Sequence, residues 1–273
     1  MDFVKMHGLG NDFVIAEASS WDEAYQLQPF AQLVCDRHFG IGADGLIVVG
    51  PDAEMDVFMR IFNPDGSEPE MCGNGIRCVA RYAYDRSWVS REALSVRTLA
   101  GPRYPQVTVE GSVRVDMGQP ILERRLIPMQ GEGSPIRAKI PAEQGEFEIT
   151  AVSMGNPHCI CFVEDVDKAP VTAWGSMLET HPMFPARTNV EFVQVLVRDE
   201  MIMRVWERGA GITLACGTGA CATLVAAVLN GLSDRKATVH LLGGDLLIEW
   251  DETDQHVYMT GPAEYVFKGQ VEL

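Results

Sequence analysis

A chain of 273 residues is long enough to form two domains, each with a hydrophobic core of its own. Its formal net charge of -16 would repel nucleic acids and anionic membranes, so we expect a small-molecule partner instead. Seven cysteines, an odd number in a chain too large to need disulfides, indicate free thiols in a reducing compartment. The N-terminus does not resemble a signal peptide and no apolar stretch is long enough to span a bilayer, so the sequence predicts a cytoplasmic protein.

The first half of the chain reads as short strands followed by a helix. Residues 29–37 predict a minor helix, and Asn63–Gly66 predicts a turn. After Cys72, apolar residues recur at helical spacing from Ile76 to Ala83. Strands are predicted for four runs rich in Val, Ile and Phe, at residues 3–7, 13–16, 46–49 and 55–62.

The second half predicts a similar arrangement. Residues 201–206 predict a strand, and residues 170–178 a minor outer helix. After Cys216, apolar residues from Ala220 to Val228 predict a central helix. Residues 119–144 contain four prolines and match nothing in the first half. We interpret them as the connection between two domains, with or without edge strands in it.

The two halves carry the same motifs in the same order. Cys216 lies 144 residues after Cys72, and each is followed by Gly-x-Gly. Arg60–Asn63 matches Arg204–Glu207 at the same offset, Val96–Gly101 matches Val239–Gly244 at 143, and Gly10–Asn11 matches Gly155–Asn156 at 145. Matches in order at nearly constant spacing predict two copies of one fold, related by pseudo-twofold symmetry.

The position of the two motif cysteines suggests a chemical use. The first N–H groups of a helix have no internal partner and lie at the positive end of its dipole, which lowers the pKa of a cysteine placed there. The glycines allow close approach, so a substrate carboxylate could accept hydrogen bonds from the backbone at Gly73, Asn74, Gly217 and Thr218. For the remaining cysteines we accept packing as the explanation: Cys35, Cys78, Cys159, Cys161 and Cys221.

Two similar domains facing each other across a cleft would bring both thiols to one bound molecule. A thiolate would remove a proton from one face of a carbon atom while the opposite thiol protonates the other face, which inverts the stereocentre. Two helix N-termini would stabilise the charge on the substrate carboxylate. We find no lysine context for pyridoxal phosphate, no metal-ligand spacing and no dinucleotide motif, so we expect neither cofactor nor metal.

Polar residues at strand ends fit a zwitterionic ligand. Arg208 would bind a carboxylate and Glu207 an ammonium group, with a surface charge pair as the alternative. His158 is either a buried core histidine or a neighbour that favours a thiolate. Four asparagines have a turn role as their ordinary explanation, although their recurrence at paired positions favours ligand contact: Asn11, Asn63, Asn156 and Asn189.

Several segments form a recognisable set: His7–Phe13, Phe62–Ser67, Met71–Cys78, Met154–His158, Glu207–Gly211, Ala215–Gly219 and Met259–Pro262. Together they resemble the diaminopimelate epimerase family, nearly from end to end. The resemblance implies interconversion of LL- and meso-2,6-diaminopimelate in lysine biosynthesis, by a cysteine pair without a cofactor. It also implies an α/β (α+β) fold of two pseudo-symmetric domains, each a curved, mostly antiparallel sheet around a central helix. We place them at residues 1–118 with 263–273, and at 119–262.

The resemblance also implies roles for single residues. Cys72 and Cys216 would be the acid and base, with Glu207 and His158 modulating their pKa values. The backbone amides of residues 73, 74, 217 and 218 would hold the reacting carboxylate, and Asn11 would also contact the substrate. Glu207 would bind the distal ammonium group. The rest of the distal amino-acid centre would be fixed by Asn63, Asn156, Asn189 and Arg208.

Two positions depart from the family pattern. Gly45 stands where a number of members carry a glutamine near the ligand, so that contact must be absent or made by backbone. Phe267 stands where many members have a tyrosine at a dimer contact; a homodimer is still expected, held there by aromatic packing.

Three alternatives stay open. Proline racemases and hydroxyproline epimerases are similar to this chain but typically have histidine where it has Asn74, and they do not need a distal set such as Asn189 and Arg208. The other two are a non-catalytic amino-acid-binding protein and a redox sensor that uses Cys72 and Cys216 as a switchable disulfide. Deuterium exchange at the substrate α-carbon separates an epimerase from both of these.

Overall fold

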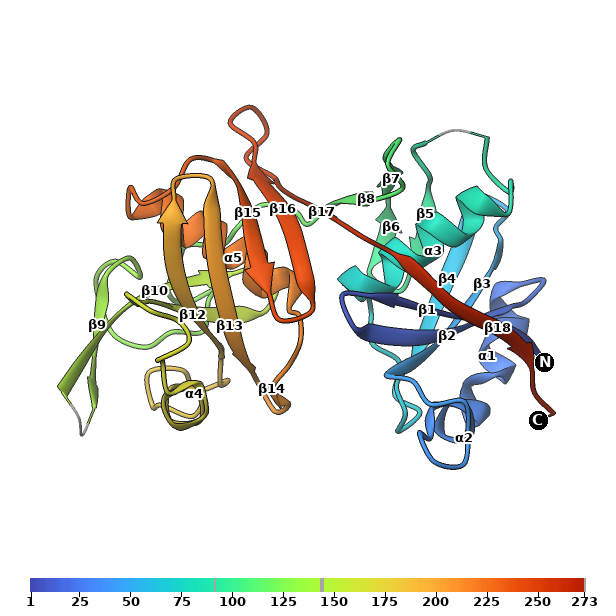
Figure 1. Ribbon diagram of the computed structural model, residues 1–273, viewed down its shortest axis with the longest axis horizontal. Helices are drawn as coiled ribbons and strands as arrows, with labels where there is room; N and C mark the ends of the chain where they lie inside the picture. Colours follow the sequence, from blue (N-terminus) through green and yellow to red (C-terminus); the bar gives the residue numbers. More distant parts are fainter. Residues whose placement is uncertain (91, 143–144, 273) are drawn as a thin grey trace. The chain divides into compact units, whose positions relative to one another are not determined.

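The computed structural model of the protein describes residues 1–90, 92–142 and 145–272. The chain divides into two compact units (Figure 1). Unit 1 comprises Met1–Asp116 and Thr260–Leu273, and unit 2 comprises Met117–Met259. Unit 2 is therefore inserted into unit 1 in sequence. No helix in the described ranges has the length and apolar character needed to cross a bilayer.

Unit 1 is a mixed sheet around one central helix, α3 (Gly73–Asp85). Its sheet has the strand order β18-β1-β2-β3-β4-β5-β6, in which β2 and β3 run parallel, as do β4 and β5. The strands are β1 (Asp2–Gly8), β2 (Asn11–Glu17), β3 (Gly45–Pro51), β4 (Val57–Phe62), β5 (Val96–Thr98), β6 (Gly101–Arg103) and β18 (Glu264–Gln270), with a hairpin of β7 (Gln106–Val107) and β8 (Val113–Asp116). α3 contacts β1 and β4, and it buries Ile76, Val79 and Ala83.

Unit 2 has the same plan around α5 (Gly217–Leu229). Its strands follow the order β9-β10-β11-β12-β13-β15-β16-β17, with β14 paired to β13. They are β9 (Ala138–Ala142), β10 (Gly145–Ser153), β11 (Pro157–Phe162), β12 (Asn189–Val197), β13 (Glu200–Glu207), β14 (Gly211–Ile212), β15 (Lys236–Leu241), β16 (Gly244–Trp250) and β17 (Val257–Gly261). α5 contacts β10 to β13, β15 and β16, so the sheet curves around it.

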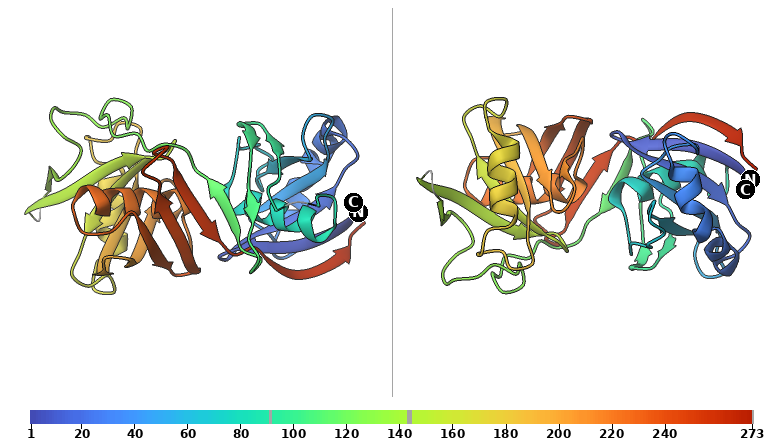
Figure 2. Two further views of the ribbon diagram at one scale, coloured as in Figure 1. Left: turned by 90° about the horizontal axis from the view of Figure 1, so that it is seen from above. Right: turned by 90° about the horizontal axis from the view of Figure 1, so that it is seen from below.

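Outer helices cover the opposite face of each sheet. Because side chains alternate along a strand, Val190 and Phe192 of β12 face away from α5 and pack with Leu178 of α4 (Val171–Glu179). Figure 2 shows α4, in yellow, lying across these strands. In unit 1, Leu46 and Val48 of β3 pack in the same way against α1 (Trp21–Gln26), η1 (Gln28–Phe30) and α2 (Ala31–Cys35).

Strand register confirms the internal repeat residue by residue. Three strand pairings of unit 1 have counterparts in unit 2 at offsets of 143 to 145 residues. They are Phe13 with Gly45 and His158 with Asn189, Leu46 with Phe62 and Val190 with Trp206, and Val57 with Val96 and Met201 with Val239. The predicted fold class is confirmed by this pairing. β9 pairs antiparallel with β10, and β18 pairs in the same way with β1.

One local prediction needs correction, and one helix was not predicted. The minor helix predicted for residues 29–37 is a 3-10 turn and a short helix that ends at Cys35. Asp36 is extended, and its carboxylate accepts hydrogen bonds from the N–H groups of His38 and Phe39, which stabilises a turn instead. The sequence analysis missed α1, although Ser20 and Glu23 have the spacing of a capping box.

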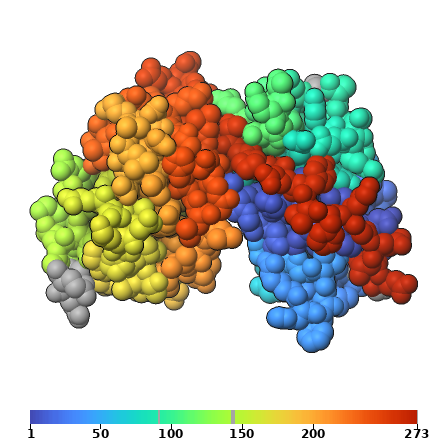
Figure 3. Space-filling model, viewed as in Figure 1, coloured from blue at the N-terminus to red at the C-terminus, as the bar shows by residue number. Residues whose placement is uncertain are grey.

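The C-terminal strand completes the sheet of unit 1. β18 pairs antiparallel with β1, and the Met1 amino group donates to the Val271 carbonyl at 2.6 Å. Figure 3 shows the last residues, in dark red, on the surface next to the N-terminal ones, in blue. β18 is therefore an edge strand, and its residues are exposed.

Candidate active site

Cys72 is the residue that caps the N-terminus of α3, as predicted. Its backbone is extended, with φ -137° and ψ 120°, and its Sγ accepts a hydrogen bond from the Gly75 N–H at 3.4 Å. Gly73 and Asn74 are the first helical residues, so their N–H groups have no acceptor inside the helix. The half-buried thiol thus lies beside donors that could bind an anion.

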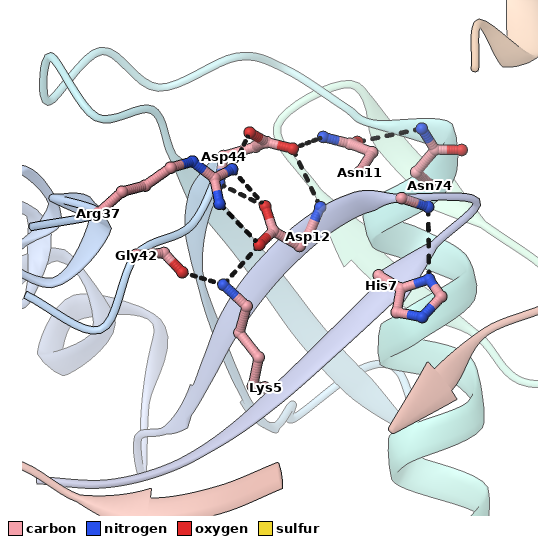
Figure 4. A network of polar contacts seen from close by, with 9 residues as sticks. Lys5, His7, Asn11, Asp12, Arg37, Gly42, Asp44 and Asn74 are labelled. Atoms are coloured by element: carbon pink, nitrogen blue, oxygen red, sulfur yellow. Dashed lines mark hydrogen bonds and ion pairs between the residues drawn. The ribbon is translucent and has the colours of Figure 1, made fainter. Parts of the chain in front are cut away.

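Asn11 lies next to Cys72 within unit 1. Its Oδ1 accepts a hydrogen bond from Asn74 Nδ2 at 3.0 Å and lies 3.9 Å from Cys72 Sγ. On its other side, Asn11 Nδ2 donates to Asp44 Oδ2 at 2.8 Å (Figure 4). The structure therefore brings together three residues that the sequence singled out, Asn11, Cys72 and Asn74.

A charged network lies behind Asn11. Asp44 pairs with Arg37 at 2.7 Å, and Arg37 in turn pairs with Asp12 at 2.8 Å. Lys5, whose side chain is buried, reaches Asp12 at 2.7 Å. Burial alone would raise the pKa of the Asp12 carboxyl, but hydrogen bonds from Arg37 and Lys5 outweigh it and hold this pKa well below its ordinary value. Asp12 is thus ionised and fixed by two cations.

Two other predicted positions of unit 1 have local roles in this structure. Asn63 follows β4 directly and donates to Ser67 twice, from its backbone N–H at 2.8 Å and from its side chain at 2.9 Å. This is the turn role that was the ordinary explanation for it. Gly45 begins β3 at the position equivalent to Asn189 in unit 2 and offers no side chain to a ligand.

Cys216 is the N-cap residue of α5, the position that Cys72 has in α3. Its backbone is also extended, with φ -128° and ψ 106°, and the thiol is buried. Thr218 Oγ1 lies 3.6 Å from Cys216 Sγ and accepts a hydrogen bond from Asn156 Nδ2 at 3.3 Å. Asn156, Cys216 and Thr218 therefore form the counterpart of Asn11, Cys72 and Asn74.

His158 joins this group from β11. Its Nδ1 lies 2.7 Å from Glu191 Oε1, and its Nε2 lies 3.0 Å from Asn156 Oδ1. The side chains of His158 and Glu191 are both fully buried. His158 is therefore a core histidine with both nitrogens hydrogen-bonded, and it is also a neighbour of the thiol.

The electrostatic surroundings of Cys216 contradict one expectation. Burial raises the pKa of the Cys216 thiol well above its ordinary value, and the carboxylates of Glu207 and Glu191 raise it further. Hydrogen bonds from Thr218 and the Gly219 N–H act in the other direction without offsetting these effects. The pKa of Cys216 is therefore raised, opposite to the direction predicted from its place at a helix start, because burial and two carboxylates disfavour the thiolate.

The pKa of the Glu207 carboxyl is raised for similar reasons. Burial raises the pKa of its carboxyl, and the charge of Glu191 adds to this effect. Thr213 Oγ1 donates a hydrogen bond to Glu207 Oε1, and a contact with the Cys216 thiol also lowers the pKa in part. Glu207 and the Cys216 thiol are therefore close enough for each to shift the pKa of the other.

Asn189 and Arg208 lie together at the end of this group. Asn189 Oδ1 accepts from the Arg208 N–H at 2.9 Å, and its Nδ2 donates to the Pro157 carbonyl at 3.0 Å. The Arg208 guanidinium donates to the Ala186 carbonyl at 3.2 Å in an exposed setting. A partly solvated guanidinium on a fixed backbone is available to a carboxylate ligand.

The sequence analysis missed Glu191 and Asp44. Glu191 is the one charged residue in the buried run from Asn189 to Val193, and a charge in an apolar strand was the available signal. Asp44 had no comparable signal, because its contact with Asn11 joins strands that begin 34 residues apart, at Asn11 and Gly45.

One group in the described part of the chain has ligand atoms close enough to share a metal ion: His158, Glu191 and Cys216, within 4.8 Å of one another. Two ligands of one tetrahedral zinc ion lie roughly 3.3 Å apart, because Zn–N and Zn–O bonds are about 2 Å long. His158 Nδ1 and Glu191 Oε1 are 2.7 Å apart, which fits a hydrogen bond and not a shared ion.

Known proteins with similar sequences match this chain over almost its whole length. The family model described as Diaminopimelate epimerase matches residues 3–123 and 150–266. A protein of that name from Moorella thermoacetica is 60% identical over 278 residues, covering 100% of each chain. Another from Heliobacterium modesticaldum is 54% identical over 287 residues, again covering 100% of each chain.

Solved structures with low identity share the fold. A PhzF-family phenazine biosynthesis protein from Bacillus anthracis has a TM-score of 0.74 at 16% identity, covering 100% of this chain and 99% of that one. A hydroxyproline epimerase from Agrobacterium vitis has a TM-score of 0.67 at 15% identity, covering 99% and 92%. At such identities the similarity establishes the architecture alone.

Proposed function

Because the chain belongs to the diaminopimelate epimerase family, we propose that it interconverts LL- and meso-2,6-diaminopimelate. The observation that carries the proposal is the repeated helix start, at which Cys72 and Cys216 each cap a helix beside an asparagine. The reaction is an isomerisation of an amino acid, the substrate class named for the relatives, and it belongs to lysine biosynthesis.

Two thiols acting on one α-carbon account for the inversion. In one direction, Cys72 as thiolate takes the α-proton while the Cys216 thiol gives its proton to the opposite face. The electron pair of the broken C–H bond becomes the new C–H bond, and the enzyme ends with its two sulfur protonation states exchanged. The surroundings of Cys216 support its starting role as donor, since burial and two carboxylates favour the protonated thiol.

Backbone donors would stabilise the intermediate. Proton removal places a second negative charge on the substrate carboxylate, so its oxygens need strong hydrogen-bond donors. The N–H groups of Gly73 and Asn74 in one unit, and of Gly217 and Thr218 in the other, are oriented by the first turns of α3 and α5. These fixed donors need no reorganisation during the reaction.

The remaining polar residues would bind the distal amino-acid centre of the substrate. Arg208 is exposed with its backbone held by Asn189, which suits a carboxylate contact. Glu207 would take the distal ammonium group, and Asn63 and Asn156 would complete the set. A substrate with one amino-acid centre, such as proline, could not use these contacts.

We also propose a cytoplasmic homodimer. Seven free thiols suit a reducing compartment. Tyr265, Val266 and Phe267 are each about half exposed on the edge strand β18, and the Phe267 ring lies against Phe3 with 5.9 Å between ring centroids. Analytical ultracentrifugation of the wild type and of Phe267→Ala tests this strand as the dimer contact.

The main test is an NMR assay in D2O with LL-diaminopimelate as the substrate. We expect meso product, with deuterium at the inverted α-carbon. Trans-4-hydroxyproline and L-proline serve as control substrates, and turnover of either one without turnover of diaminopimelate would favour the racemase alternative. Binding of diaminopimelate without α-deuteration would favour a binding protein.

A further inference from the structure

We propose that Asp44 is a positioning residue that fixes the side-chain amide of Asn11, so that Asn11 meets the substrate only as a hydrogen-bond acceptor. The inference rests on the proposed function in one respect, since Asn11 is taken to contact the substrate. Its structural part concerns unit 1 alone and does not depend on which amino acid is bound.

The direction of the Asn11 amide follows from its neighbours. An ionised carboxylate only accepts hydrogen bonds, so Asp44 Oδ2 at 2.8 Å requires the NH2 end of the Asn11 amide on that side. The carbonyl end must then point the other way, where Asn74 Nδ2 donates to it at 3.0 Å and Cys72 Sγ lies at 3.9 Å. The same Asp44 oxygen accepts the Asp12 N–H at 3.0 Å, which ties the carboxylate to the turn that carries Asn11.

The network behind Asp44 holds its carboxylate in place (Figure 4). Asp44 Oδ1 pairs with Arg37 Nη2 at 2.7 Å. The Arg37 guanidinium also donates hydrogen bonds to both carboxylate oxygens of Asp12. The Asp44 backbone N–H donates to the Asp12 carbonyl at 2.9 Å. Since Arg37 and Asp44 are about half exposed, with side-chain exposures of 55% and 41%, this ion pair adds little stability, and its effect is geometric.

The orientation of the Asn11 amide determines which substrate group binds to it. Asn11 Oδ1 accepts from Asn74 on one lone pair, and its other lone pair is approached by the Cys72 S–H at 3.9 Å, a donor that is absent when Cys72 is the thiolate. An amino acid at the reacting centre offers one strong donor, its ammonium group, whereas its carboxylate only accepts. Asn11 is thereby assigned to the ammonium group, and the backbone donors of α3 remain for the carboxylate.

The described residues of unit 2 hold no copy of this arrangement. Asn156 is the counterpart of Asn11, but its Nδ2 donates to Thr218 and its Oδ1 faces His158. The residue 144 positions after Asp44 is Thr188, whose hydroxyl donates to the backbone of Asn189 at 2.9 Å. The two asparagines thus present opposite ends of their amides near the two cysteines.

The first experiment reads the Asn11 amide directly, without substrate. In protein labelled with 15N-asparagine, the side-chain amide signal of Asn11 is identified by its loss in Asn11→Ala. We expect Asp44→Ala to move this signal to the position of a solvent-exposed amide. Asp36→Ala is the matched control, because Asp36 lies in the same segment and its carboxylate accepts backbone N–H groups, from His38 and Phe39, without touching Asn11. An Asn11 signal unmoved by Asp44→Ala, or moved equally by Asp36→Ala, would overturn the proposal.

The second experiment asks whether Asp44 acts through Asn11. We expect Asp44→Ala to lower kcat/KM for LL-diaminopimelate by about tenfold, mainly through a higher KM, because the ammonium contact exists before and during proton transfer. In an Asn11→Ala background, Asp44→Ala should lower kcat/KM by less than about twofold. Equal losses in both backgrounds would refute a role through Asn11. Absence of turnover in the wild type would count against the proposed function and leave the amide measurement as the test of Asp44.

Discussion

Replacing Gly219 with alanine should harm unit 2 more than replacing Gly75 harms unit 1. Both glycines are the third residue of a cysteine-capped helix. A Cβ at Gly219 would lie 2.7 Å from Glu191 Oε1, whereas ordinary contact begins at 3.4 Å. A Cβ at Gly75 would lie 3.0 Å from the terminal methyl groups of Ile47 and Met59, which can move aside at little cost.

The magnitude follows from the hydrogen bond that must stretch. Glu191 Oε1 lies 2.7 Å from His158 Nδ1, and a displacement of about 0.7 Å away from the new methyl group would break this contact. Loss of a hydrogen bond to a buried charged group costs about 1.5–3 kcal/mol, and the higher helix propensity of alanine returns up to about 1 kcal/mol. We therefore expect Gly219→Ala to lose about 1–2 kcal/mol of the free energy of unfolding, and Gly75→Ala to change it by less than about 1 kcal/mol.

Urea denaturation of both variants, followed by circular dichroism and by tryptophan fluorescence, measures this difference. The two variants carry the same chemical change at equivalent helix positions, so helix propensity cancels in the comparison. If Gly75→Ala were destabilised as much as Gly219→Ala, the carboxylate of Glu191 would not be what constrains the start of α5.

Three further predictions concern chemistry, binding and acid stability. Cys72→Ala and Cys216→Ala should each abolish epimerisation, and serine should leave weak activity at best; near wild-type turnover in either alanine variant would end the two-base mechanism. Arg208→Ala should cost on the order of 2–5 kcal/mol in binding the distal centre, measured by calorimetry, and unchanged affinity would make Arg208 a surface residue. Because the folded-state pKa of Asp12 is lowered from 3.8, its contribution to stability is present above that pH and is lost below it. Asp12→Asn should therefore weaken the dependence of stability on pH in acid, and an unchanged acid titration would contradict this reading.

The repeat and the helix starts were predictable because their signals are local. Cysteine followed by Gly-x-Gly, and then apolar residues at helical spacing, specifies α3 and α5 without knowledge of the rest of the chain. The nearly constant offset between motifs predicted two copies of one fold, and the matching strand registers of the two units agree with it. Helix α1 was not predicted because its 6 residues are too few to show helical periodicity.

The chemistry around the thiols was less predictable, because it depends on residues brought together by strand pairing. The local argument from a helix dipole gave the wrong direction for the pKa of Cys216, since it omitted Glu191 from β12 and Glu207 from β13. Likewise, Asp44 reaches Asn11 only because β2 and β3 are parallel neighbours. Such contacts become visible once the sheet is formed.

The pairing of β18 with β1 has a consequence for biosynthesis. β1 leaves the ribosome before the whole of unit 2, and β18 leaves it after unit 2, so one edge of the unit 1 sheet stays open until β18 has emerged. Unit 2, which is continuous in sequence, can complete its own fold during that interval. A nascent chain stalled before Glu264 would therefore display the unpaired backbone of β1, and chaperones that bind exposed strands would find their target there.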